Sequence, residues 1–195
     1  MTLLRGVAAG LLPGLLALTA AVGADAPKTE EGFTPLFNGK DLTGWRYKGS
    51  KESLEGKTET PDGRIRVEGG AIVMREKDAR GRGGIKDLYT LKNFPRPFHL
   101  KLQFRASLKA DSGVYVRGPQ LQVRDFIRRG EEKQLTKFKN DDWNELEIAV
   151  KGQTATCSVN GQPLQVMKVP DKGPIGLQAE SGKFEFRRVR IKELP

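Results

Sequence analysis

Hydrophobic and polar residues alternate with a period of two along much of this chain. The clearest example is segment 98–105, FHLKLQFR, in which every second residue is Phe or Leu and the others are polar. Successive side chains of a β-strand leave its plane on opposite sides. The pattern therefore predicts a strand with one buried face.

Shorter alternating or apolar segments, bounded by turn residues, predict further strands. We expect them at 33–37, 65–68, 71–74, 85–91, 113–117, 120–124, 144–151, 154–159, 162–167, 175–179 and 184–192. Asn160-Gly161 favours a type I′ hairpin turn, and Pro35 favours an edge strand because proline cannot donate to a ladder. The last strand changes phase near Arg187-Arg188, which predicts a bulge there.

Three other features complete the pattern. Trp45 is large and is expected to pack across one end of the structure. Residues 46–63 are polar and without periodicity, which predicts an exposed loop. Residues 126–142, FIRRGEEKQLTKFKNDD, are charged and fit either a loop lying over a site or a weak helix.

Composition agrees with an all-β fold. The 195 residues include 23 Gly and 11 Pro, and 37% are hydrophobic. Many turns with a modest apolar fraction suit short strands rather than a helical bundle. We predict one antiparallel β-sandwich domain at 33–195, preceded by a polar linker at 25–32.

The first 24 residues have the pattern of a secretory signal peptide. Arg5 precedes an apolar run, and Val22-Gly23-Ala24 supplies small residues at the expected cleavage position. An uncleaved anchor is the alternative, but the run is short and Pro13-Gly14 interrupts it. We expect a secreted or periplasmic protein with no membrane span after cleavage.

The chain has one cysteine and one histidine. Cys157 lies in phase with Ala155 and Val159, which predicts a buried small hydrophobe rather than a nucleophile. His99 is on the polar side of its strand and is expected to be exposed. This set offers no transition-metal constellation, so we predict no metal or other cofactor, with calcium on Asp and backbone oxygens left open.

The formal net charge is +10, from 34 Lys and Arg against 24 Asp and Glu. The positive residues are spread out, with local runs at 75–86 and 124–133. Neither run has the aromatic interleaving of a nucleic-acid motif, so we predict no specific nucleic-acid partner. We interpret the charge mainly as solubility and nonspecific attraction to polyanions, with a heparin-like polymer binding at 75–86 as a further hypothesis.

One side of the central strands carries groups suited to a sugar. Val114 and Val116 share a face, as do Leu121 and Val123. The opposite side would then present Tyr115, Arg117, Gln120, Gln122 and Arg124. Arginine and glutamine hydrogen-bond hydroxyls, and an aromatic ring stacks on a pyranose. The same pattern also fits an ordinary solvated sheet face.

Four segments together resemble a known family. They are FTPLFNGKDLTGW, DSGVYVRG followed by QLQVRD, WNELEIAVKGQTATCSVNG and GPIGLQAESGKFEFRRVRIKEL, in that order. The chain resembles the 3-keto-disaccharide hydrolase domain family over 33–194. The resemblance implies a concanavalin A-like jelly roll and a secreted hydrolase that cleaves glycosides oxidised at carbon 3.

The resemblance also implies site residues. Arg117, Asp125 and Glu180 would be catalytic, as an oxyanion contact, a base or metal ligand, and a second carboxylate. The predicted substrate-binding residues are Tyr115 and Arg124, from the strand alternation, together with Asp111, Gln120 and Gln122, which lie in the segments that carry the resemblance. The plainer interpretations are a surface ion pair for Arg117, a strand-end cap for Asp125 and a turn residue for Glu180.

Two positions depart from the family's common pattern. Asp111 stands in place of Asn, and Gln120 in place of Glu. An amide cannot act as a base, so the alternative function is a noncatalytic carbohydrate-binding module of the same fold. In either case the expected partner is a carbohydrate; the sugar and the oligomeric state are left open.

Overall fold

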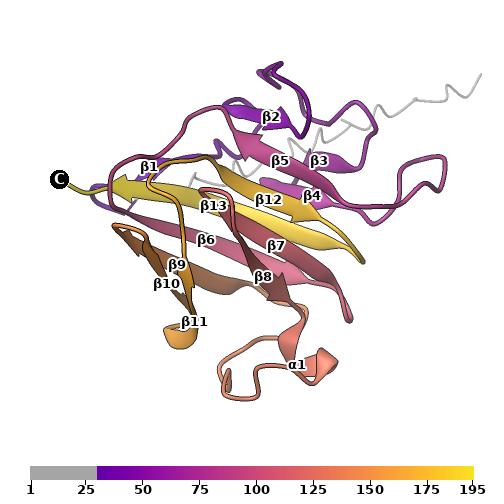
Figure 1. Ribbon diagram of the computed structural model, residues 1–195. Coiled ribbons are helices and arrows are strands. Elements are labelled where there is room, and N and C mark those ends of the chain that lie inside the picture. Colours follow the sequence, from indigo (N-terminus) through magenta and orange to yellow (C-terminus); the bar gives the residue numbers. More distant parts are fainter. Residues whose placement is uncertain (1–29) are drawn as a thin grey trace, which may run out of the picture.

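A computed structural model describes residues 30–195 as a sandwich of two antiparallel sheets (Figure 1). The predicted signal peptide at 1–24 and most of the linker lie outside the described residues. The eight-stranded sheet has the order β11-β10-β9-β6-β13-β4-β3, with β1 added at β13. Its strands are β1 (Thr34–Pro35), β3 (Ile65–Glu68), β4 (Ala71–Met74), β6 (Phe98–Ala106), β9 (Asn144–Lys151), β10 (Thr154–Val159), β11 (Gln162–Lys168) and β13 (Phe184–Glu193).

The second sheet has five strands in the order β2-β5-β12-β7-β8. They are β2 (Trp45–Tyr47), β5 (Lys86–Thr90), β12 (Ile175–Ala179), β7 (Asp111–Val116) and β8 (Gln120–Arg124). Within the described residues, the only helix is the single turn α1 (Phe126–Arg129), which directly follows β8. The prediction of an antiparallel β-sandwich is confirmed.

The core lies between the sheets and is built by the period-two alternation. The apolar side chains of β6, from Phe98 to Phe104, are at most 1% exposed, whereas the intervening polar ones face outward. Phe104 stacks on Phe184 of the neighbouring β13 at 5.6 Å between ring centroids. Each such buried ring contributes about 1.5–3 kcal/mol relative to an exposed one. Cys157 is also buried, as predicted.

The predicted hairpin turn, strand bulge and edge strand are all confirmed. Asn160 and Gly161 have φ angles of 49° and 76°, which are the positive values that a type I′ turn requires. The bulge in β13 lies between Arg187 and Arg190, and Arg188 has a φ of 51°. Pro35 is in the edge strand β1, which pairs only with β13.

Two sequence-based expectations were wrong. The segment 46–63 does not begin as a loop, because β2 continues to Tyr47, and Leu54 and Thr60 are buried. Arg117 lies beyond β7, and its φ of 57° turns the chain out of the strand. It therefore leaves the alternation that would have placed its side chain beside Tyr115.

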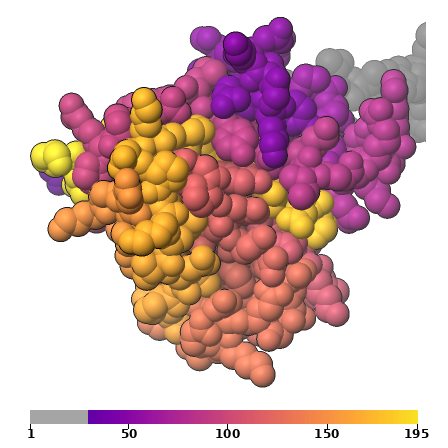
Figure 2. All heavy atoms as spheres, in the orientation of Figure 1, coloured from indigo at the N-terminus to yellow at the C-terminus, as the bar shows by residue number. Residues whose placement is uncertain are grey.

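The loops gather at opposite ends of the molecule. Figure 2 shows the indigo and magenta segments of the first third at one end and the salmon segment around α1 at the other. In the part of the chain that the structure describes, no helix is long and apolar enough to span a membrane.

Candidate functional site

The outward side of the five-stranded sheet carries a continuous set of polar and aromatic side chains. Strand register places Arg46 opposite Tyr89, and both Tyr89 and Tyr115 opposite Gly176. Tyr115 is in turn paired with Gln120. We call this surface the polar face; its residues are Arg46, Lys48, Asp87, Tyr89, Asp111, Tyr115, Gln120, Gln122, Arg124, Gln178 and Glu180.

Two tyrosines form the aromatic part of the polar face. The rings of Tyr89 and Tyr115 lie 5.3 Å apart with an interplanar angle of 37°. They close over Gly176, where an added Cβ would lie 2.7 Å from Tyr89 and 3.0 Å from Tyr115. The Arg46 guanidinium lies 5.4 Å from the centre of the Tyr89 ring, within the range of a cation–π interaction.

A buried carboxylate lies beneath the aromatic pair. Asp87 is fully buried, and Lys48 Nζ lies 2.6 Å from its Oδ2. The hydrogen bond to Asp87 raises the pKa of Lys48. Burial and the charge of Asp87 likewise raise the pKa of Tyr115, so its hydroxyl keeps its proton at neutral pH. The Lys48 side chain as a whole remains about half exposed.

Amide side chains order the centre of the polar face. Gln178 Nε2 donates to the Tyr115 hydroxyl at 2.8 Å, and Gln120 Nε2 donates to Gln178 Oε1 at 2.5 Å. Gln120 can lie across β7 because Gly113 has no side chain; a Cβ there would lie 2.0 Å from the Gln120 amide nitrogen. The Gln122 amide is oriented with its nitrogen toward two acceptors, and this nitrogen donates to Asp111 Oδ1 at 3.1 Å.

At the end of the polar face near α1, two carboxylates are paired with arginine, whereas a third, that of Glu180, is not. Arg124 donates to Asp111 at 2.8 Å and to Glu131 at 3.0 Å, so these two acids are neutralised within the protein. Glu180, which follows β12, accepts no hydrogen bond from the described residues. Partial burial, together with the nearby charge of Asp111, raises the pKa of Glu180 above its usual value of 4.5.

The sequence-predicted Arg117 lies away from the polar face. Its buried guanidinium donates to four backbone carbonyls, those of Phe94, Arg96, Gly152 and Pro170. The same group lies 5.3 Å from the ring of Phe98, which belongs to the opposite sheet. The structure therefore places Arg117 where it joins three loops at one end of the sandwich.

The sequence-predicted Asp125 is also directed away from the polar face. It is fully buried, and its Oδ2 accepts hydrogen bonds from the Lys109 backbone N–H at 2.7 Å and from Arg128 at 2.6 Å. Its Oδ1 has no partner among the described residues. Asp125 falls on the core side of the β8 alternation, whereas Arg124 falls on the outer side. The position fits the plainer interpretation of a strand-end residue.

The other six predicted residues lie on the polar face, namely Asp111, Tyr115, Gln120, Gln122, Arg124 and Glu180. Sequence reasoning missed Arg46, Lys48, Asp87, Tyr89 and Gln178. A signal for two of them was present, because Asp87 and Tyr89 alternate with Leu88 and Thr90 in β5. The contribution of Gln178 depends on β12 lying between β5 and β7, which no local pattern reveals.

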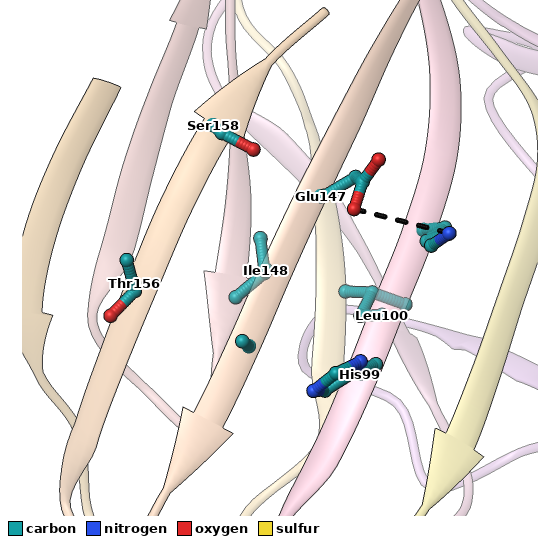
Figure 3. A pocket seen from close by; sticks show the side chains of 8 residues that line it. His99, Leu100, Glu147, Ile148, Thr156 and Ser158 are labelled. Carbon is teal, nitrogen blue, oxygen red and sulfur yellow. Dashed lines mark ion pairs between the residues drawn. The ribbon is translucent and has the colours of Figure 1, made fainter. Parts of the chain in front are cut away.

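A separate hollow of about 150 Å³ lies on the outer side of the eight-stranded sheet. Figure 3 shows His99 and Glu147 beside it, with Thr156 and Ser158 on the next strand. The pair drawn there joins Glu147 to Lys101 at 3.9 Å. No Phe, Tyr or Trp side chain lines this hollow. Among residues 30–195, no group of three or more His, Cys, Asp and Glu side chains is placed to hold a metal ion.

Comparison with known proteins identifies related sequences and folds. The family model of the 3-keto-alpha-glucoside-1,2-lyase-like domain matches residues 32–192. No curated protein sequence matches the chain significantly.

Solved structures share the sandwich. One glycosyl hydrolase candidate of Parabacteroides distasonis is 22% identical, with 85% of this chain and 95% of that chain covered and a TM-score of 0.63. A second from the same organism is 20% identical, with 83% and 99% covered and a TM-score of 0.57. The carbohydrate-binding module CBM66 of Bacillus subtilis is 12% identical, with 78% and 97% covered and a TM-score of 0.51. At these identities the likeness concerns the fold.

Proposed function

Because the chain belongs to the 3-keto-alpha-glucoside-1,2-lyase-like domain family, we propose that it cleaves glycosidic bonds of 3-keto-glycosides at the polar face. The family and the fold support a glycosyl hydrolase-like or carbohydrate-binding sandwich. The more specific proposal, cleavage of 3-keto-glycosides, is supported by the residues of the polar face. We also propose export from the cytoplasm, on the signal-peptide pattern of residues 1–24.

The proposed reaction starts at carbon 2 of the sugar. A ketone at carbon 3 makes the hydrogen on carbon 2 acidic. Glu180 removes this proton, and the electrons move into an enolate. The bond from carbon 1 to the leaving oxygen then breaks, and that oxygen takes a proton from the Tyr115 hydroxyl. Water then adds across the resulting double bond: its hydroxyl bonds to carbon 1, its remaining proton returns to Tyr115, and carbon 2 takes back the proton held by Glu180, so both side chains regain their starting states.

Neighbouring side chains support each stage of this route. In this proposal the Lys48 ammonium, which is ion-paired with Asp87, stabilises the negative charge of the enolate oxygen. Gln120 and Gln178 present amides to sugar hydroxyls, and the tilted pair Tyr89–Tyr115 offers a stacking surface. Tyr89, Tyr115, Gln120 and Gln178 come from strands of one sheet, so their relative positions are fixed by hydrogen-bonded register, and Lys48 directly follows β2 of the same sheet.

The single observation that carries the proposal is the state of Glu180. It is a partly buried carboxylate with a raised pKa and no hydrogen-bond donor among the described residues. The other acids of the polar face, Asp87 and Asp111, are both paired with cations. A general base works best when its pKa lies near the working pH, and Glu180 is the acid here whose surroundings move it in that direction.

The proposal predicts the behaviour of the Glu180→Gln variant with a 3-keto-glucoside. We expect turnover to fall by about 100-fold or more, because the amide cannot accept the proton. Glu55→Gln, an exposed acid in the loop after β2, is the matched control and is expected to retain full activity. Chromatographic release of the leaving group measures both rates. Equal rates in wild type and Glu180→Gln would contradict the assignment.

The pH profile gives a second readout of the same variant. Glu180 acts only when deprotonated, so turnover rises with pH as this group loses its proton. Since burial and Asp111 raise its pKa, the rising limb lies above the ordinary value of 4.5. The limb is expected to be absent from any residual activity of Glu180→Gln, whereas misfolding would lower the rate at every pH.

A second candidate function is noncatalytic carbohydrate binding. Gln120 favours it, because this amide stands where the family commonly has an acid and is hydrogen-bonded to Gln178. CBM66, a carbohydrate-binding module, shares the sandwich. Under this alternative the wild type binds a glycan but releases no product. Calorimetric binding measured together with the turnover assay separates the two functions.

A further inference from the structure

A cavity of about 270 Å³ lies at the end of the molecule where the 76–84 loop meets β5. The loop is the magenta projection of Figures 1 and 2. The lining residues are Asp62, Arg64, Asp78, Arg82, Gly83 and Lys86. This volume is slightly below the usual range for drug-sized ligands and is ample for a small ion. None of these residues belongs to the polar face.

Arg64 is a buried cation without a carboxylate partner. Its side chain is 1% exposed, and Nε donates to the Arg75 carbonyl at 3.0 Å while Nη1 donates to the Gly84 carbonyl. Nη2 is buried and has no partner among the described residues. A buried charge that is not neutralised costs stability, and a guanidinium N–H without an acceptor adds to that cost.

The carboxylates of the two acids in the cavity already accept hydrogen bonds from neighbouring groups. Asp62 Oδ1 accepts from Thr60 at 2.8 Å and from the Arg64 backbone at 3.1 Å, and its Oδ2 accepts from Tyr47. Asp78 accepts from the backbone of Arg82 at 2.8 Å and from the Arg82 Nε at 2.7 Å. Neither carboxylate forms an ion pair with the Arg64 guanidinium, although Asp62 keeps its negative charge beside it.

Lys86 brings to the cavity a second cation without an ion pair among the described residues. Its Nζ lies 5.8 Å from the ring centre of Tyr47, and its charge helps to lower the pKa of Asp62. The lining therefore holds three cations and two acids, a net charge of +1, with Arg82 paired to Asp78. Guanidinium and ammonium groups that converge on one space are the usual recognition elements for oxyanions.

We propose that this cavity is a binding site for a single sulfate or phosphate group, held by Arg64 Nη2 and Lys86 Nζ with Arg82 at the rim. The group can arrive as a free ion or as a substituent of an acidic saccharide. The site is independent of the polar face, so the two proposals stand or fall separately. It also gives the basic run 75–86 a specific role, in place of diffuse attraction to polyanions.

Titration calorimetry of the full chain with inorganic sulfate and with inorganic phosphate tests the proposal. We expect saturable one-to-one binding that Lys86→Gln weakens about tenfold, as the loss of one charge-assisted hydrogen bond implies. The matched control is Arg80→Gln, which removes a charge from the same loop at an exposed position outside the cavity. It is expected to bind like wild type. Glucose 6-sulfate in a second titration distinguishes a sugar-borne group from a free ion, by binding more tightly than sulfate alone.

Two results would overturn the proposal. One is the absence of saturable binding of either ion to the wild-type protein. The other is equal weakening by Arg80→Gln and Lys86→Gln, which would assign the affinity to the general charge of the loop. Lys86 is partly exposed, so its substitution leaves the core intact, and a circular-dichroism melt of each variant verifies that it is folded.

Discussion

Arg117 shows how one backbone angle redirects a functional group. The sequence DSGVYVRG places it in phase with Tyr115, and strict alternation would put both on one surface. Instead the chain turns at Arg117, and the guanidinium binds carbonyls of three separate loops. These bonds tie the three loops together at one end of the sandwich. Arg117 therefore has a structural role in joining these loops and does not reach the polar face.

This role predicts a stability phenotype for Arg117→Lys. A lysine cannot reach all four carbonyls at once, so we expect the free energy of unfolding to fall by about 3 kcal/mol. Turnover per folded molecule is expected to stay near the wild-type value. Urea denaturation and the turnover assay measure the two quantities. Arg96→Lys, an exposed arginine in the same end loops, is the control. Loss of turnover with unchanged stability would restore Arg117 as a substrate contact.

At the residue scale the sequence could predict part of the site. Tyr115, Gln120, Gln122 and Arg124 lie on the polar face because β7 and β8 keep their alternation to the last residue. The inward direction of Asp125 does follow the β8 alternation, because Asp125 continues the core-facing series of Leu121 and Val123, and its side chain bonds to Arg128. The failure at Arg117 is different, because there the strand has ended and periodicity no longer constrains the direction of the side chain.

At the element scale, β12 is the strand that assembles the polar face. It lies between β5 and β7, although both precede it by many residues in the chain. Two of its outward positions, Gly176 and Gln178, have complementary roles. The glycine leaves room for the tyrosine rings, and the glutamine joins Tyr115 to Gln120.

We therefore expect Gly176→Ala to disturb ligand binding. The new methyl group would lie 2.7 Å from Tyr89 and 3.0 Å from Tyr115, so both rings must move apart. Overpacking of this kind typically costs about 1–3 kcal/mol of stability. Calorimetry with a saccharide ligand measures the loss of affinity.

Gly83→Ala is the matched control for this substitution. Its added Cβ would meet no atom closer than 3.6 Å, and Gly83 is remote from the polar face. Saccharide binding is expected to be unchanged in this variant. If Gly176→Ala binds a saccharide as tightly as Gly83→Ala does, the tyrosine pair is not the stacking surface.

Most elements could be predicted because their signals are local. The hairpin β3–β4 has Gly69-Gly70 between two short apolar runs, and β10–β11 has Asn160-Gly161. The strand β2 was missed because three residues are too few to show a period. Its place in the sheet is fixed by pairing with β5, which is tertiary information.

At the scale of the whole molecule, the two sheets present different outer surfaces. The outer side of the eight-stranded sheet is laced with ion pairs, such as Arg190–Glu145 at 2.5 Å and Arg105–Glu185 at 2.6 Å. The guanidinium carbons of Arg105 and Arg187 lie 4.8 and 3.9 Å from the centre of the Trp143 ring. On the polar face Lys48 and Arg124 are likewise ion-paired, with Asp87 and Asp111, but Glu180 accepts no hydrogen bond from the described residues. This difference supports the proposal that a ligand binds at the five-stranded sheet.

The most direct test of this account is a crystal structure of the Glu180→Gln variant soaked with a 3-keto-glucoside. The account predicts a sugar ring over Tyr89 and Tyr115, with carbon 2 facing residue 180 and the carbon 3 oxygen near Lys48. Sugar bound instead in the hollow beside His99 and Ser158, or a polar face that stays free of sugar at saturating concentration, would contradict it.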